Sequence, residues 1–320
     1  MRKTNSRFLK ITNSSLFTLL LTSICTSAFA GVISGEVHDL KTPSGKTEHC
    51  IILDKIPGGK YSDGDNEKEQ RFCSSDLYSQ DFAICPKTWS TSAALVVYKL
   101  EGTGQTRQQF EAKNCRQSNG FKALGKFKIT MNQSGTSGTF SKSSMIYYHM
   151  SRLFNSTVDI PPAIYRTIDK KLVCSVAQRA KGQSAMNRTA WKIILNACVN
   201  PDSYKPVDDI FTPDREQFFG TFYKGNGDRY NSEINSPRKA AWGAPQSVEF
   251  QTTAAYAALR SEKDLSQAIK AGEASARKIP VMNKDLGSQP ISPVQMTYWM
   301  KELSEISIFD HIFSQQDRVG

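Results

Sequence analysis

Cysteine content constrains the fold of this chain more than any other feature of its sequence. Six of its seven cysteines lie between positions 50 and 198: Cys50, Cys73, Cys85, Cys115, Cys174 and Cys198. An even set of this kind in an exported protein predicts a framework of three disulfides. The sequence does not choose among the possible pairings, although short loops favour Cys50–Cys73, Cys85–Cys115 and Cys174–Cys198. Zinc binding is the alternative, but no two of these cysteines have Cys-x-x-Cys spacing, and we predict no metal site.

The amino terminus indicates export. Four basic residues between positions 2 and 10 precede the apolar stretch Leu16–Ile24, and the small residues Ala28 and Ala30 mark a cleavage site. Residues 1–30 are therefore predicted to be a signal peptide, and the mature chain is expected to begin at Gly31 in the periplasm or outside the cell. The apolar stretch is too short to cross a membrane as a mature helix. No long uncharged apolar run follows it, so we expect no transmembrane segment in the mature chain.

The mature chain is basic. Without the four basic residues of the signal peptide, 37 Lys and Arg face 30 Asp and Glu, a net charge of +7. The basic residues are spread along the chain and are not clustered with aromatic residues, so nucleic-acid binding is not expected. Such a surface suits an anionic lipid or a phosphorylated ligand.

Residues 31–90 are predicted to form a small β-rich region. Apolar residues alternate or cluster in segments 31–40 and 49–56, as they do in strands. Segment 57–70 is polar and rich in Gly, Asp and Asn, which predicts a loop.

Residues 91–170 are predicted to be a lobe of strands with one helix. The expected elements are a buried strand at 92–100, a turn at 101–106, a returning strand at 107–115, a third strand at 120–131, a helix at 143–154 and a strand at 158–169. Lys126 and Lys128 alternate with apolar residues in the third strand, so both lie on one of its faces.

Residues 171–320 are predicted to be mainly helical. The expected helices cover 187–198, 252–278 and 292–306, the last with Ser292 as its N-cap. Strands followed by helices indicate an α+β protein of two lobes.

Two local motifs carry a resemblance to a known family. In the first, the helical run His149, Met150, Ser151, Arg152, Leu153 is followed by Val158, Pro161, Pro162 and Arg166. In the second, the pair Phe309 and Asp310 precedes Asp317 and Arg318. These motifs resemble the secretory-pathway atypical protein kinases, the Golgi casein kinase-like family with its bacterial exported relatives. The resemblance implies a kinase-like core with a β-rich amino-terminal lobe at 91–170 and an incomplete helical lobe at 171–320.

The resemblance also implies site residues. Asp317 would be the catalytic carboxylate, and Lys128, with Lys126 beside it, would hold the phosphates of ATP with Mg²⁺ as the second cofactor. Gly102 and Gly104 would form the turn over the phosphates. The alternative phosphate-binding turn is the later loop of Gly135 and Gly138, because it opens a helix amino terminus.

The chain departs from the family at functional positions. Ser144 stands where the family has the glutamate that pairs with the strand lysine, and no acidic residue occurs between Gly120 and Asn155. Val319 replaces a histidine, and no segment for the metal-binding aspartate follows. We therefore expect an inactive kinase-like protein, or a fragment of an active one, that binds nucleotide weakly.

Simpler interpretations exist for each residue. Lys126 and Lys128 fit the solvent-facing side of a strand, and an Asp-Arg dipeptide fits a surface ion pair. The alternative function is a secreted, non-enzymatic binding or interaction protein on the same scaffold. A secreted hydrolase is disfavoured, because the sequence has neither a nucleophile elbow nor a His-Glu-x-x-His motif.

Overall fold

The architecture is α+β, as the sequence predicts. A computed structural model describes residues 34–113, 115, 121–224, 248, 250–278, 280, 283–284 and 287–313. The predicted signal peptide and Asp317 lie outside these residues. Within them the chain forms one seven-stranded antiparallel sheet and eight α-helices.

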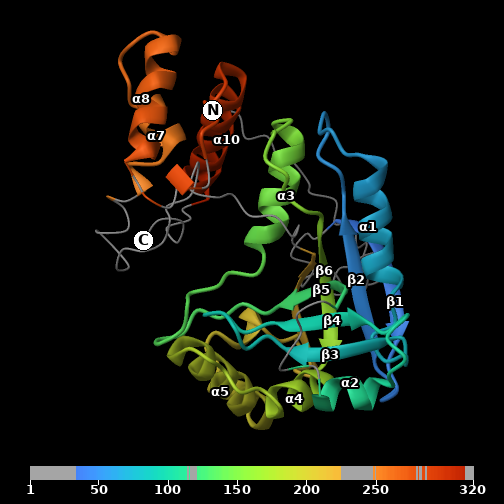
Figure 1. The fold of residues 1–320 in the computed structure, drawn as a ribbon. Coiled ribbons are helices and arrows are strands. Elements are labelled where there is room, and N and C mark those ends of the chain that lie inside the picture. Colours follow the sequence, from blue (N-terminus) through green and yellow to red (C-terminus); the bar gives the residue numbers. More distant parts are fainter. Residues whose placement is uncertain are drawn as a thin grey trace, which may run out of the picture. The chain divides into compact units, whose positions relative to one another are not determined.

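The sheet places neighbours in space that are far apart in the sequence. Its strands are β1 (Gly35–Lys41), β2 (Thr47–Leu53), β3 (Phe82–Pro86), β4 (Leu95–Lys99), β5 (Ala123–Lys128), β6 (Ala163–Asp169) and β7 (Gln217–Tyr223). Their order across the sheet is β1-β2-β6-β7-β5-β4-β3 (Figure 1). The sheet therefore takes strands from each of the three segments that sequence analysis distinguishes, 31–90, 91–170 and 171–320.

The helices are α1 (Asp63–Ser74), α2 (Arg107–Lys113), α3 (Ser143–Leu153), α4 (Lys170–Gln178), α5 (Ala185–Val199), α7 (Ala254–Leu259), α8 (Leu265–Arg277) and α10 (Pro293–Ile312). Short 3-10 turns occupy Pro201–Ser203 and Val207–Asp209. The predicted strands at 92–100, 120–131 and 158–169 are confirmed as β4, β5 and β6. The predicted helices are confirmed too, with 252–278 divided into α7 and α8, and Ser292 accepts a hydrogen bond from the backbone N–H of Gln295 as the N-cap of α10.

Two local predictions are wrong. Segment 57–70 is not all loop, because α1 begins at Asp63. Ser62 caps it, since the Ser62 hydroxyl accepts from the Asp65 N–H and the Asp65 carboxylate accepts from the Ser62 N–H. Segment 107–115 does not return as a strand, because Arg107–Lys113 form α2 and bury Phe110. Its residues are mostly strong helix formers.

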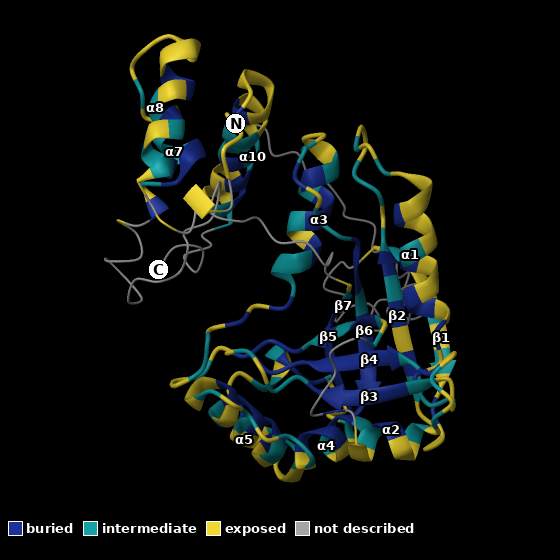
Figure 2. Cartoon of the chain, viewed as in Figure 1, coloured by how far each residue is buried: buried dark blue, intermediate teal, exposed yellow. Residues whose placement is uncertain are grey.

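One face of the sheet carries the main core (Figure 2). Helices α1, α4 and α5 cover this face, which we call the core face. The largest fully buried side chains here include Trp191 of α5, Phe72 of α1 and Phe222 of β7. The buried colouring of β3, β4 and β6 contrasts with β1, which lies at the edge and is mostly exposed. This core fixes the central strands that position the candidate site.

The opposite face is covered by α2 and α3, and we call it the α3 face. Phe110 of α2 packs with Val96 and Tyr98 of β4. Met145 and Tyr148 of α3 pack with Ala163 of β6, and Tyr223 lies against the same cluster. The residues of β4 and β6 therefore alternate between the two faces, as the pleat requires. In β5 the register against β4 shifts, and both Leu124 and Phe127 reach the main core.

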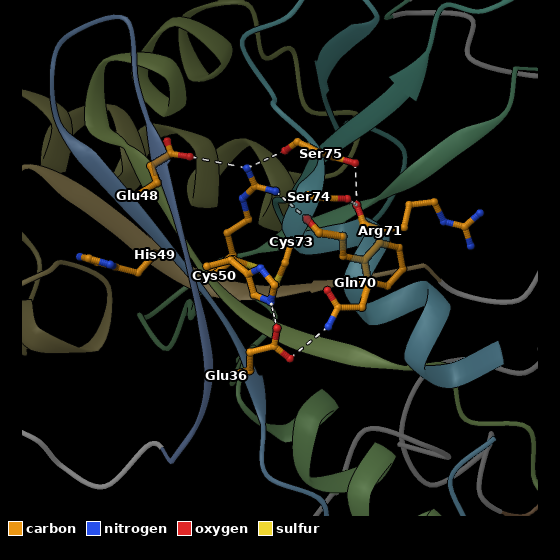
Figure 3. The surroundings of a disulfide bond; sticks show 12 residues. Glu36, Glu48, His49, Cys50, Gln70, Arg71, Cys73, Ser74 and Ser75 are labelled. Atoms are coloured by element: carbon orange, nitrogen blue, oxygen red, sulfur yellow. Dashed lines mark hydrogen bonds and ion pairs between the residues drawn. A yellow bond between two sulfur atoms is a disulfide. The ribbon is translucent and has the colours of Figure 1, made fainter. Parts of the chain in front are cut away.

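Three disulfides are present, Cys50–Cys73, Cys85–Cys115 and Cys174–Cys198. The pairing that short loops favour is confirmed. Cys50–Cys73 joins β2 to α1 (Figure 3), and Cys174–Cys198 joins α4 to α5. Three disulfides are typical of a protein from an oxidising compartment outside the cytoplasm. Among the described helices, none is long and apolar enough to span a bilayer.

Candidate functional site

Lys126 and Lys128 lie on the α3 face of β5. In the sheet register Lys128 is opposite Thr221, and Lys126 is opposite Tyr223. Residues directly opposite each other on antiparallel strands project to the same face. The Thr221 hydroxyl donates to the carbonyl of Ser141, just before α3, over 2.7 Å. The predicted placement of both lysines on one face is therefore confirmed, and that face is the one beneath α3.

A third lysine lies at the amino end of α3. Lys142 precedes α3, and its Nζ lies 5.3 Å from the ring centroid of Phe219 on β7. Phe219 stacks on Tyr165 of β6 with the ring centroids 5.7 Å apart. Burial raises the pKa of Tyr165 to about 12, so this phenol stays neutral at physiological pH and adds no negative charge near the lysines.

The segment from β5 to α3 is basic throughout. Residues 121–154 contain four lysines and one arginine but no Asp or Glu: Lys122, Lys126, Lys128, Lys142 and Arg152. The N-cap position of α3 is Lys142, which makes no side-chain cap hydrogen bond to the first turn. A basic segment that leads into a helix amino terminus is suited to an anion.

The Gly135 and Gly138 loop lies in this segment. Both glycines have left-handed backbone conformations, with φ of 76° and 61°, which glycine adopts without steric cost. The loop is closed by a bridge between Met131 and Thr139, and the Thr130 and Ser141 hydroxyls are 2.9 Å apart. This loop connects the lysine strand directly to α3.

Gly102 and Gly104 are not brought to the lysines. They follow the carboxyl end of β4, also with left-handed φ values of 75° and 65°. Because Leu95 pairs with Phe127 and Tyr98 with Ala123, Lys128 lies beside the amino end of β4. The turn and Lys128 are thus at opposite ends of this strand pair, roughly 20 Å apart along the strand. Of the two turns considered for phosphate, the Gly135 and Gly138 loop is the one that follows Lys128 in the chain, and a Cβ at Gly135 would lie 3.5 Å from Thr189 of α5.

The pocket nearest the Gly102 turn does not suit phosphate. It has a volume of about 440 Å³ and is lined by Gln80, Asp81, Phe82, Lys99, Leu100, Glu101 and Gln105. Its two carboxylates, with a single lysine, would repel an anion.

The second family-like motif is described only in part. Asp317 lies outside the described residues. Asp310, on α10, accepts a hydrogen bond from the Tyr147 hydroxyl of α3 over 2.7 Å. Phe309 is buried, and its ring centroid lies 5.8 Å from that of Tyr147. The Phe309–Asp310 pair therefore contacts α3 directly.

Glu305 makes a second contact, between α10 and the segment that connects α3 to β6. One oxygen of its carboxylate accepts from the hydroxyls of Ser156 and Thr157 and from the backbone N–H groups of Thr157 and Val158. Burial raises the pKa of Glu305, but these hydrogen bonds outweigh burial and lower it. Helix α10 is therefore fixed to the connection between α3 and β6.

A polar cluster that sequence analysis missed joins α1 to α3. Arg152 of α3 binds Asp65 of α1 through two hydrogen bonds of 2.8 Å each. Burial raises the pKa of Asp65, but the hydrogen bonds and charge of Arg152 outweigh it and lower the pKa to about 2. Burial and the cations of Lys55 and Arg152 lower the pKa of His149 to about 4. His149 is therefore a neutral, packed residue of α3.

A polar cleft of about 330 Å³ lies beside the Arg152–Asp65 pair. It is lined by Lys60, Ser62, Gly64, Asp65, Lys68, Ser151, Arg152, Asn155, Ser156, Thr157, Val158 and Asp159. Among the residues that the structure describes, no group of His, Cys, Asp or Glu side chains is arranged to hold a metal ion. No protein-family model, curated protein or solved structure matches the chain, so its own geometry is the basis for a functional interpretation.

Proposed function

We propose that this chain is an exported, kinase-like protein that binds the phosphates of a nucleotide on the α3 face of its sheet. The observation that carries the proposal is the placement of Lys126 and Lys128. They lie on a strand that leads, through a glycine loop, into a helix covering the same face. Charge-assisted hydrogen bonds from lysine to phosphate are among the stronger ones in proteins.

The topology around this strand supports the proposal. The chain passes from β5 to α3 and β6, continues through α4 and α5, and returns as β7, which pairs between β5 and β6. A strand with lysines, β5, is thus followed by a helix and two further strands, and the last of these lies between the other two strands in the sheet. This order resembles the amino-terminal lobe of protein kinases. The contacts of Asp310 and Glu305 with α3 and with the α3–β6 connection are compatible with a second, helical lobe.

We expect binding without efficient phosphoryl transfer. Ser144 stands on α3 where the family carries a carboxylate, and residues 121–154 supply no other acid. In protein kinases the pairing of the strand lysine with that carboxylate is required for activity. ATP, with or without Mg²⁺, is therefore proposed as a ligand and not as a substrate. The periplasm or the extracellular space is the proposed location.

The alternative function is a secreted binding protein that uses no nucleotide. The observation in its favour is exposed apolar surface on α10 and just after α3. Phe154 is 51% exposed, and Ile308 and Ile312 are 53% and 48% exposed. Apolar side chains that gather on a surface are typical of protein interaction sites.

Replacement of Lys128 by alanine is expected to weaken ATP binding about ten-fold or more, since a hydrogen bond to a charged group contributes roughly 1.5–3 kcal/mol. Calorimetry with ATP, with and without Mg²⁺, measures the change. Lys171→Ala, on exposed α4 surface, is the matched control and should leave the affinity unchanged. Asp317→Ala should leave it nearly unchanged. Absence of ATP binding in all conditions would support the interaction-protein alternative instead.

A further inference from the structure

We propose that Asp65 and Arg152 are positioning residues, through which α1 holds α3 in place against β6 and β7, on the sheet face that also carries the lysines of β5. This inference rests on the proposed function, because it assigns a role in forming the phosphate-binding face. Neither residue contacts that face, so both act through the position of α3.

The Asp65–Arg152 pair has the geometry of a rigid link. Arg152 Nε and Nη2 donate to the two oxygens of Asp65, each over 2.8 Å. Nη2 also donates to the carbonyl of Ile160, 2.9 Å away and just before β6. Asp65 is only 4% exposed. A bidentate pair of arginine and carboxylate fixes orientation as well as distance, so it sets the angle of α3 relative to α1.

Side chains from the segment between β2 and α1 add further contacts to α1 and α3. Lys55 binds Glu69 of α1, which is 1% exposed, and the Lys55 Nζ lies 5.8 Å from the ring centroid of Tyr148 on α3. The Tyr61 hydroxyl is 2.8 Å from Nδ1 of His149. These contacts and the Asp65–Arg152 pair together form what we call the α1–α3 clamp.

Helix α1 is itself fixed to the sheet. The Cys50–Cys73 disulfide attaches its last turn to β2, and the Phe72 ring packs on Phe222 of β7, 5.2 Å between centroids. Because α1 packs on the core face and α3 on the opposite face, the clamp joins them around the end of the sheet. A movement of α3 away from its face would have to break the clamp, since α1 cannot follow.

The clamp lies at the same end of the sheet as the lysines. Lys126 pairs with Tyr223, and Tyr223 pairs with Ala163 at the start of β6. Lys126 is therefore about 10 Å from β6, two strand spacings. The amino end of α3 carries Lys142 and is bonded to β7 through Ser141 and Thr221. A helix of this length moves as a rigid rod, so release of its carboxyl end displaces the amino end as well.

The test compares ATP affinity and backbone hydrogen exchange in Asp65→Asn with the unmodified protein. Asp65→Asn keeps the side-chain shape but removes the charge that Arg152 binds. ATP affinity is expected to fall about five-fold or more, within the range for residues that act without touching the ligand. Exchange within 143–153 should become faster. The charge-swapped double variant Asp65→Arg with Arg152→Asp should recover at least part of both losses.

Ile194→Ala is the matched control. Ile194 is buried on α5, so this change destabilises the core without touching the clamp, and ATP affinity should not change at a temperature where the variant is folded. If Asp65→Asn lowers the melting temperature but leaves both affinity and exchange at 143–153 unchanged, the positioning role is wrong. If the unmodified protein binds no ATP, the proposed function fails. In that case unchanged exchange at 143–153 in Asp65→Asn would overturn the clamp independently.

Discussion

Replacement of Arg166 by alanine is expected to lower the free energy of unfolding by about 3–5 kcal/mol, the range for removing one partner of a buried ion pair. The Arg166 side chain is completely buried on the core face, 3.7 Å from the Glu48 carboxylate, which is also buried. Its guanidinium donates to the carbonyls of Phe72 and Ser75 on and after α1 over 2.7 and 2.9 Å. Alanine at position 166 would leave the Glu48 carboxylate and the carbonyls of Phe72 and Ser75 without the guanidinium group. Glu48 and Ser75 are labelled in Figure 3.

Urea unfolding followed by circular dichroism measures this loss. Arg215→Ala is the control, because Arg215 pairs with Asp202 in an exposed ion pair of 2.7 Å, and such pairs contribute about 0–1 kcal/mol. Replacing Glu48 and Arg166 together by apolar residues should recover much of the stability. A loss below about 1 kcal/mol in Arg166→Ala would mean that the buried pair is not formed as described.

Replacement of Phe222 by alanine is expected to destabilise the protein by about 3–5 kcal/mol, as for other buried Phe→Ala changes. Phe222 is fully buried at the centre of the sheet, opposite Phe127 of β5. Its ring packs on Phe72 and also fills the space above Gly125, where an added Cβ would lie 2.5 Å from it. Removal of the ring would leave a cavity between β5, β7 and α1.

Thermal and urea unfolding of Phe222→Ala measure this effect. Val199→Ala is the comparison, because Val199 is 89% exposed and surface substitutions usually change stability by less than about 0.5 kcal/mol. Equal stabilities for the two variants would contradict the packing of Phe222 in the main core.

Local patterns predicted the strands whose apolar residues are continuous or alternate, such as Leu95–Lys99. They failed for α1, because most of its residues are polar and only its last turn reaches the main core with Phe72 and Cys73. A capping signal was present in Ser62 and Asp65, three residues apart. The glycines around it favoured a loop instead.

Strand β7 was missed for another reason. Its aromatic residues are typical of a strand, but it lies within a part of the chain whose other segments favour helices. Its position between β5 and β6 depends on pairing with residues about 50 to 100 positions earlier in the sequence. No local pattern contains that information, so neither the strand order nor the closeness of Lys128 to Thr221 was predictable.

The same limits apply to the candidate site. Alternation placed Lys126 and Lys128 on one face correctly, since it depends only on strand geometry. The role given to Gly102 and Gly104 assumed that 107–115 returns as a strand. That assumption is wrong, because Arg107–Lys113 form the helix α2. Arg152 had no predictable partner, because Asp65 is 87 residues away in a segment interpreted as a loop.

Labelling with a lysine-reactive acyl-phosphate derivative of ATP tests the central claim most directly, because the reagent acylates lysines beside the bound phosphates. Peptide mass spectrometry identifies the modified positions. We predict modification of Lys126 or Lys128 that excess ATP suppresses, with Lys171 of α4 unlabelled or labelled equally in the presence and absence of ATP. Labelling confined to other lysines, or labelling of Lys126 and Lys128 that ATP does not reduce, would contradict a phosphate-binding site on the α3 face.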